Sequence, residues 1–332
     1  MARFTRLLTP IKRNPLRGIC RRQYRLIAIK SNPLQGILRR SFLLIAFVSL
    51  VCVSLQAQDS SYARRIICDL SSPEMYGRGM QNRGDSIAAD YLRRELVSLG
   101  VKPLTKGYYQ YFHFPNTRTK PPIVRAGYRS QNVCGFIPGE TDTMIVFTAH
   151  YEHVGMHGDT IFPGAHDNAS GTAAVMDLAR MTSLQPGHYT YVFLFFSGEE
   201  SGLIGSHFFA DSPLINLKKV KLLVNIDLFC GGDEGLMVVN ANGKDTKPYV
   251  DLLEQLNEER HYAVKIGRRD NAPNSDHWFL SQYCPAVFIY TLGGPFGGYH
   301  SPTDTCEGCG LGNYHNFTTL LKVFLEHLEN AQ

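Results

Sequence analysis

The chain has 332 residues, with 34 lysines and arginines against 29 aspartates and glutamates. Eleven of the basic residues and none of the acidic ones fall in residues 1–57, so the rest of the chain holds 23 basic against 29 acidic residues, a formal net charge of −6. The basic character therefore belongs to the first segment alone. Because the remainder has no basic stripe, we expect no nucleic-acid partner.

Residues 1–57 are predicted to be a basic leader that ends in a signal peptide. An uncharged apolar run, residues 41–55, follows Arg40 and is followed closely by Ala57. This order is typical of a signal peptide cleaved after Ala57, and the run is short for a membrane span. We therefore expect a secreted or periplasmic protein without a membrane span in its mature part, residues 58–332, which is long enough for one α/β domain.

Helical and strand patterns alternate along the mature part. Apolar spacing predicts helices over residues 61–70 and 85–99, and strict alternation predicts a strand over residues 108–114. Uninterrupted apolar runs of strand length then begin at Met144, Tyr191, Val220, Leu236 and Ala286. Helices are predicted at residues 171–183, 203–210, 246–259 and 314–329. Since such runs indicate strands covered on both faces, the predicted fold is a three-layer α/β/α sandwich with a mostly parallel mixed central sheet.

Six cysteines lie in the mature part, and the sequence does not choose among their possible pairings. Cys306 and Cys309 form a lone CxxC motif. We interpret this motif as a local disulfide or two free thiols rather than as a second zinc site.

Side chains that bind metals follow the ends of the apolar runs or precede the next helix. They are His150, Asp167, Glu199, Glu200, Asp227 and His300. Each of them alone would be read as a helix cap, a salt bridge or a solvated loop residue. However, the carboxyl ends of parallel strands meet at one edge of a sheet, so these groups are expected to share a small volume. Several carboxylates packed together repel one another and are costly to bury without a cation.

Imidazoles and carboxylates are ligands that suit Zn²⁺. Two ions about 3.5 to 4 Å apart need one bridging carboxylate and terminal ligands for each ion. Five side chains meet that need, so the sequence predicts a centre with two zinc ions. The residues alone do not decide which of the adjacent Glu199 and Glu200 is the ligand.

Six segments occur in an order that resembles the M28 family of metallopeptidases, which includes bacterial aminopeptidases. They are AHYEHVG, GAHDNASG, FFSGEESGLIGS, NIDLFCGG, SDHWF and YHSPTDT, and they carry the chain from His150 to Thr305. The resemblance implies a phosphorylase/hydrolase-like zinc exopeptidase fold. It also implies an aminopeptidase that removes N-terminal residues from peptide substrates with a metal-activated water molecule.

The resemblance assigns the metal ligands position by position. His150 and Glu200 are expected to hold one zinc ion, Asp227 and His300 the other, and Asp167 is expected to bridge them.

Four further positions receive roles in the same way. Glu199 is expected to be the general base, and the Tyr299 hydroxyl is expected to help stabilise the oxyanion. Glu152 stands where the family commonly has an aspartate and is expected to orient the first metal-binding histidine. Asp304 is expected to hydrogen-bond to the last one.

Other polar residues near these segments are given ordinary roles. His166 stands where many family members have an acid and is expected to face solvent. His153 and His157 are expected to line the cleft, and Ser275 is expected to cap a helix.

Three alternative functions are weighed against the aminopeptidase. A glutaminyl-peptide cyclotransferase on the same fold would bind one zinc ion and consume no water. A carboxypeptidase would need a cation for the substrate carboxylate, for which Arg268 and Arg269 are candidates. A non-catalytic homologue is disfavoured because all five ligands and the base are present.

Overall fold

The computed structural model describes residues 60–80, 82–114, 127–184, 187–294 and 298–331. The predicted leader, its cleavage point at Ala57 and the boundary of the mature domain lie outside the described residues, so these remain predictions.

Nine strands of the described chain form one mixed sheet in the order β1-β3-β7-β4-β8-β11-β9-β10, with β2 paired to β3. The strands are β1 (Lys102–Pro103), β2 (Tyr109–His113), β3 (Arg129–Ile137), β4 (Met144–His150), β7 (Thr190–Phe196), β8 (Val220–Ile226), β9 (Gly235–Val239), β10 (Ile266–Arg269) and β11 (Ala286–Leu292). The strands β7, β4, β8 and β11 run parallel to one another at the centre. Their carboxyl ends therefore meet at one edge. On the flanks, β3 is antiparallel to β7 and β9 is antiparallel to β11.

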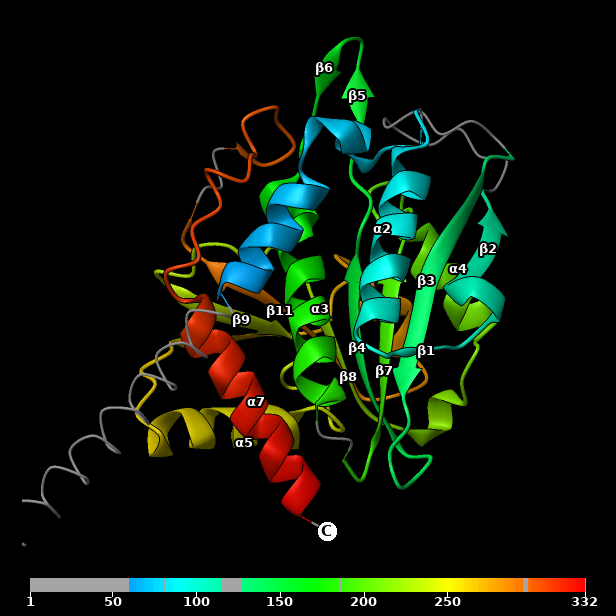
Figure 1. Cartoon of the computed structure of the whole chain (residues 1–332). Helices are drawn as coiled ribbons and strands as arrows, with labels where there is room; N and C mark the ends of the chain where they lie inside the picture. The colour runs from blue at the N-terminus through cyan, green and yellow to red at the C-terminus, as the bar shows by residue number, and fades with distance from the viewer. Residues whose placement is uncertain (1–59, 81, 115–126, 185–186, 295–297, 332) are drawn as a thin grey trace, which may run out of the picture. The chain divides into compact units, whose positions relative to one another are not determined.

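Helices cover both faces of the sheet (Figure 1). They are the helix over residues 60–70, α2 (Gly84–Ser98), α3 (Ser170–Ser183), α4 (Ile204–Asp211), α5 (Lys247–Glu259), α6 (His277–Leu280) and α7 (Tyr314–Asn330). The first helix, α2, α3, α5 and α7 pack into the core on one face, whereas α4 and α6 pack on the other. The three-layer sandwich is thus confirmed, with a mixed sheet that is parallel at its centre and in its outermost β9–β10 pair. None of the described helices has the length and apolar character needed to cross a membrane.

The central strands owe their conformation to burial on both sides. Every residue of β4 is buried; Ile145 and Phe147 point into the core beneath α3, and Val146 points into the core beneath α4. A continuous apolar run satisfies both layers at once. All five predicted apolar runs are strands in the structure.

Strand β3 escaped prediction because its first half is polar although it is buried. Ser130 donates a hydrogen bond to Asp85 Oδ2 at 2.8 Å, and Asn132 donates one to Gln110 Oε1 at 3.0 Å. These side chains are buried, and their partners come from α2 and β2. Hydrogen bonds to distant residues replace the apolar contacts that would have marked this strand in the sequence.

Two disulfides join distant parts of the chain: Cys68 pairs with Cys306, and Cys230 pairs with Cys309. The expectation that the CxxC cysteines form a local bridge or stay free is therefore wrong. Each cysteine of the motif instead faces a partner from another element, the helix over residues 60–70 or the segment after β8. The bridges anchor the loop that follows residue 298 to the core.

Candidate metal centre

The predicted ligands lie at the carboxyl edge of the central strands. His150 is the last residue of β4, and Asp227 directly follows β8, its hydrogen-bonded neighbour. Glu200 lies in the loop after β7. Asp167 lies in a short turn, η3 (Ala165–Ala169), that leads into α3, and His300 lies in the loop after β11. The parallel strands bring residues that are far apart in sequence to one place.

One group of ligands consists of His150, Asp167 and Asp227. His150 Nε2 lies 3.3 Å from Asp167 Oδ1 and 3.3 Å from Asp227 Oδ1. All three side chains are buried.

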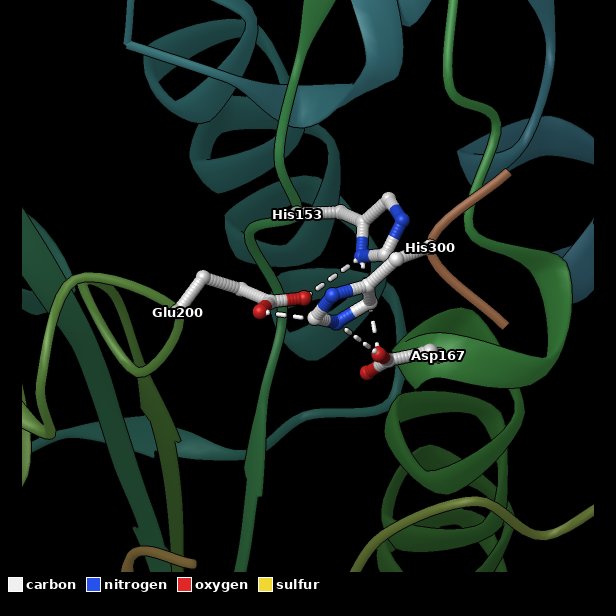
Figure 2. A group of neighbouring side chains, drawn as sticks. All are labelled: His153, Asp167, Glu200 and His300. Carbon is white, nitrogen blue, oxygen red and sulfur yellow. Dashed lines mark ion pairs between the residues drawn. The ribbon is translucent and has the colours of Figure 1, made fainter. Parts of the chain in front are cut away.

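A second group consists of His153, Asp167, Glu200 and His300 (Figure 2). His300 Nε2 lies 3.0 Å from Asp167 Oδ2 and 2.9 Å from Glu200 Oε2. His153 Nδ1 lies 2.8 Å from Glu200 Oε1. Asp167 belongs to both groups and presents a different carboxylate oxygen to each. Its carboxylate thus lies between the two groups.

The predicted division of the ligands between two ions is wrong. His150 groups with Asp227 rather than with Glu200, and Glu200 groups with His300. The physical reason is the distance of each acid from its strand: both β7 and β8 pair with β4, but Asp227 directly follows β8, whereas Glu200 lies four residues beyond the end of β7. The loop after β7 instead carries Glu200 towards the His300 loop, and the Glu200 amide is fixed there by a hydrogen bond to Glu152 Oε1 at 3.1 Å.

The raised pKa values of the two histidines indicate that a cation would stabilise the carboxylates of both groups. Burial lowers the pKa of His150, but Asp227, Glu199 and Asp167 outweigh it and raise the pKa well above its usual value. Burial likewise lowers the pKa of His300, while hydrogen bonds to Asp167 and Glu200 raise it to about 10. The carboxylates thus hold positive charge on the imidazoles, which is the charge that a divalent ion would supply.

Unsatisfied atoms point to the same conclusion. Glu200 Oε1 and both ring nitrogens of His153 are buried and make no hydrogen bond within the described chain. Orphaned buried polar atoms cost about 1 to 3 kcal/mol each, so native sites supply partners for them. Imidazole nitrogens and carboxylate oxygens at these spacings fit zinc.

Glu199 faces a pocket and belongs to neither ligand group. The pocket has a volume of about 300 Å³, and its lining includes His150, Asp227 and Tyr299 beside Glu199. Burial raises the pKa of Glu199 well above its usual value. The two adjacent glutamates therefore point to different places, and only Glu199 reaches the space where a substrate would lie.

Tyr299 lies at the rim of the same pocket and is half exposed. Its ring stacks on the His300 ring with 3.9 Å between centroids. Burial and the surrounding carboxylates raise the pKa of Tyr299, so its hydroxyl remains a hydrogen-bond donor at neutral pH.

Glu152 and Asp304 do not make the hydrogen bonds to the metal-binding histidines that the sequence predicted. His150 Nδ1 contacts the backbone carbonyl of Glu152 at 3.2 Å, whereas the Glu152 carboxylate lies 3.9 Å away. Asp304 does not bond to His300. Its two oxygens accept hydrogen bonds from the backbone N–H groups of His166 at 2.8 Å and Asp167 at 3.1 Å. Asp304 therefore fixes the turn that carries the bridging carboxylate.

Two more expectations are corrected near this turn. His166 is buried rather than exposed, and its Nδ1 accepts a hydrogen bond from the Cys230 N–H at 3.3 Å. Ser275 does not cap α6 through its side chain. The Ser275 hydroxyl donates to Asp227 Oδ2 at 2.9 Å and accepts from Asn225 at 2.8 Å. Ser275 thus orients a metal ligand.

Replacing Ser275 with alanine should weaken metal binding at the His150–Asp227 group by about 10- to 100-fold, because partners behind a ligand fix its orientation. Competition with a chromogenic chelator measures this affinity. Ser281→Ala, which removes a hydroxyl bonded only to backbone and to Asn271, is the matched control. Equal metal affinity in the Ser275 and Ser281 variants would show that the hydrogen bond to Asp227 has no such role.

Imidazoles and carboxylates that gather at the carboxyl edge of a three-layer sheet are typical of metal-dependent hydrolases. The family model of peptidase family M28 matches residues 132–325, more than half of the chain. The chain belongs to this family.

Individual relatives agree with the family. A probable leucine aminopeptidase of Trichophyton verrucosum is 26% identical over 200 residues, which cover 57% of this chain and 55% of that protein. The aminopeptidase YwaD of Bacillus subtilis is 32% identical over 147 residues, which cover 42% of this chain and 29% of that protein. The chain thus spans about half or less of the length of these curated relatives.

Solved structures share the fold. A Zn-dependent exopeptidase from Parabacteroides distasonis superposes with a TM-score of 0.64 at 17% identity, covering 80% of this chain and 97% of that one. A glutaminyl cyclase from Bacteroides thetaiotaomicron superposes with a TM-score of 0.63 at 14% identity, covering 79% of this chain and 95% of that one. These likenesses extend to both enzyme types and concern the fold alone.

Proposed function

We propose that this protein is a zinc-dependent exopeptidase with two metal ions, which acts as an aminopeptidase on peptide substrates. The observation that carries the proposal is the pair of ligand groups that share Asp167, with Glu199 beside them in the pocket. The family membership and the named aminopeptidase relatives support the reaction class.

The chain's own residues provide the steps of hydrolysis. Bound zinc supplies Lewis acidity, which makes water a stronger acid and polarises a carbonyl oxygen. Glu199 takes the proton of the attacking water and then delivers it to the departing amine. Tyr299 donates a hydrogen bond to the oxyanion that develops on the scissile carbonyl.

The side chains around the pocket favour an aminopeptidase over a carboxypeptidase. Arg268 is committed to Asp251 and Glu254 at 2.7 and 2.6 Å, so it does not serve a substrate. Arg269 lines the pocket and donates to the Tyr290 hydroxyl at 2.9 Å. It is one cation facing several carboxylates, so recognition of a substrate carboxylate would depend on Arg269 alone.

The test compares three reactions of purified mature protein. We expect a leucyl chromogenic substrate to be hydrolysed, the same peptide with a blocked N-terminus to be left intact, and hydrolysis to stop with a strong chelator and return with zinc. Cyclisation of a peptide with N-terminal glutamine, without hydrolysis, would establish the glutaminyl cyclase alternative that the shared fold also allows. Cleavage of the blocked peptide from its C-terminus, abolished in Arg269→Ala, would establish a carboxypeptidase.

Metal binding should depend on pH because it displaces protons from the imidazoles. Carboxylates raise the pKa of His150 and bring the pKa of His300 to about 10, so both rings are protonated in the metal-free centre at neutral pH. Zinc affinity should therefore fall as pH decreases and rise as pH approaches about 10. Calorimetric titrations in buffers of different ionisation enthalpy measure the protons released. Affinity that stays constant between about pH 6 and pH 9 would contradict this linkage.

We also propose that the mature protein is exported. The charge and apolar pattern of residues 1–57 and the two long-range disulfides support a route through an oxidising compartment. Edman sequencing of the protein from the periplasm or medium should begin at Gln58. Retention of the leader on a protein whose thiols are all reduced would overturn export.

A further inference from the structure

We propose that His153 is a further protein ligand of the metal position formed by Glu200 and His300. This position would then be closed by four protein ligands, whereas the His150–Asp227 position keeps an open site. The inference rests on the proposed two-metal centre and adds that its two positions are unequal: one holds its ion tightly, and the other presents its ion to water and substrate.

The spacing around His153 is that of a ligand shell (Figure 2). His153 Nδ1 lies 2.8 Å from Glu200 Oε1 and 3.8 Å from Asp167 Oδ2. His300 Nε2 lies 2.9 and 3.0 Å from the other oxygen of Glu200 and from Asp167 Oδ2. Four ligands at about 2.0 to 2.1 Å from a zinc ion in a tetrahedron are separated by about 3.3 Å. The observed separations lie on both sides of this value.

Among the described residues, the polar contacts of His153 are with the acids of the second ligand group, Glu200 and Asp167. The side chain is 2% exposed, and neither ring nitrogen makes a hydrogen bond to the described residues. The short contact with Glu200 does not meet hydrogen-bond geometry, although both atoms are buried. An imidazole nitrogen close to a carboxylate oxygen without a hydrogen bond is the arrangement of two ligands that share one ion.

The ring is also held in place before any ion binds. Gly164 lies against it, and a Cβ atom at Gly164 would stand 2.5 Å from the His153 Cγ and Cδ2 atoms. Arg78 fixes the backbone on both sides of this contact, because it donates to the Tyr151 and Gly164 carbonyls at 2.7 Å each. The absence of a side chain at position 164 makes room for an imidazole that faces Glu200.

The pocket distinguishes the two positions. Its lining includes His150, Asp167 and Asp227, and among the described lining residues none is His153, Glu200 or His300. Zinc positions with four protein ligands are typically structural, and positions with three protein ligands are typically catalytic because they keep a place for water. The position that lines the pocket is thus the one with three protein ligands, although His300 of the other position is itself exposed.

Zinc titration of metal-free mature protein tests the inference. Wild-type protein should bind two ions in separate steps, and His153→Ser should weaken the tighter step by more than the ~100-fold reached by groups behind a ligand. The weaker step should be unchanged. His157→Ser, an exposed histidine in the same loop region, should match wild type.

Cobalt spectroscopy separates a ligand from a positioning residue. The first equivalent of Co²⁺ should give the strong visible absorption of a four-coordinate ion in wild type and a weaker, altered spectrum in His153→Ser. An unchanged spectrum would make His153 a positioning residue and overturn the proposal, as would equal zinc affinity in the His153 and His157 variants. If wild type binds two ions and hydrolyses peptides, such a result leaves the proposed function standing; if wild type binds no zinc, the proposed function fails as well.

Discussion

Glu199→Gln should lower kcat by about 10²- to 10⁴-fold while zinc content stays at the wild-type level. The amide keeps the size and one acceptor oxygen of the carboxylate but cannot take a proton from water. Glu199 lines the pocket and lies outside both ligand groups, so its loss should not open the metal centre. Steady-state kinetics and metal analysis on the same preparation measure both quantities.

The adjacent glutamate provides the matched control for this experiment. Glu200→Gln alters a member of the second ligand group and should release zinc as well as activity. Turnover near the wild-type value in Glu199→Gln, or loss of zinc from that variant, would show that Glu199 is not the base. Retention of zinc by both variants would contradict the assignment of Glu200.

Arg78→Met should lower the free energy of unfolding by about 3 kcal/mol or more, because each buried acceptor left without a donor costs about 1 to 3 kcal/mol. The Arg78 side chain is fully buried, and burial lowers its pKa to about 10. Its five N–H groups donate to backbone carbonyls of Leu70, Tyr151, Pro163, Gly164 and Asp167 at 2.6 to 3.3 Å. The methionine would leave all five acceptors without this donor.

Chemical denaturation of the mature protein measures this loss. Arg94→Met, at an exposed position on α2, should change stability by less than about 0.5 kcal/mol. Arg78→Lys keeps the charge but not the planar fork and should recover only part of the lost stability. If Arg78→Met unfolds at the same denaturant concentration as Arg94→Met, the network does not stabilise the fold.

The central strands were predicted correctly because burial on both faces requires a run of apolar residues, and such a run is visible in the sequence. A strand such as β4 is apolar at most of its positions because both of its faces are buried. Strand β3 lacks such a run because Ser130 and Asn132 are polar. Their hydrogen bonds to Asp85 and Gln110 come from residues outside the strand, so the sequence around β3 does not reveal them. The cysteine pairs could not be predicted from the sequence either, because pairing depends on which helices and loops meet in the fold.

The sequence predicted which residues form the candidate site better than it predicted how those residues are arranged. A residue that directly follows a predicted strand is expected at the edge of the sheet. The five proposed ligands do come together there. Their division depends on the conformation of the loops, because Asp227 directly follows β8 and contacts His150, whereas the loop after β7 carries Glu200 to His300. His153 gave no signal beyond its nearness to His150 in sequence, and Arg78 gave none, since its partners are backbone carbonyls.

Anomalous diffraction at the zinc edge, from crystals of the mature protein grown with zinc, tests the central claim most directly. We predict two peaks about 3.5 to 4 Å apart, both in contact with Asp167. One peak should lie beside His150 and Asp227, and the other beside Glu200 and His300. Crystals that show no zinc between these side chains, or zinc only elsewhere on the protein, would contradict the claim.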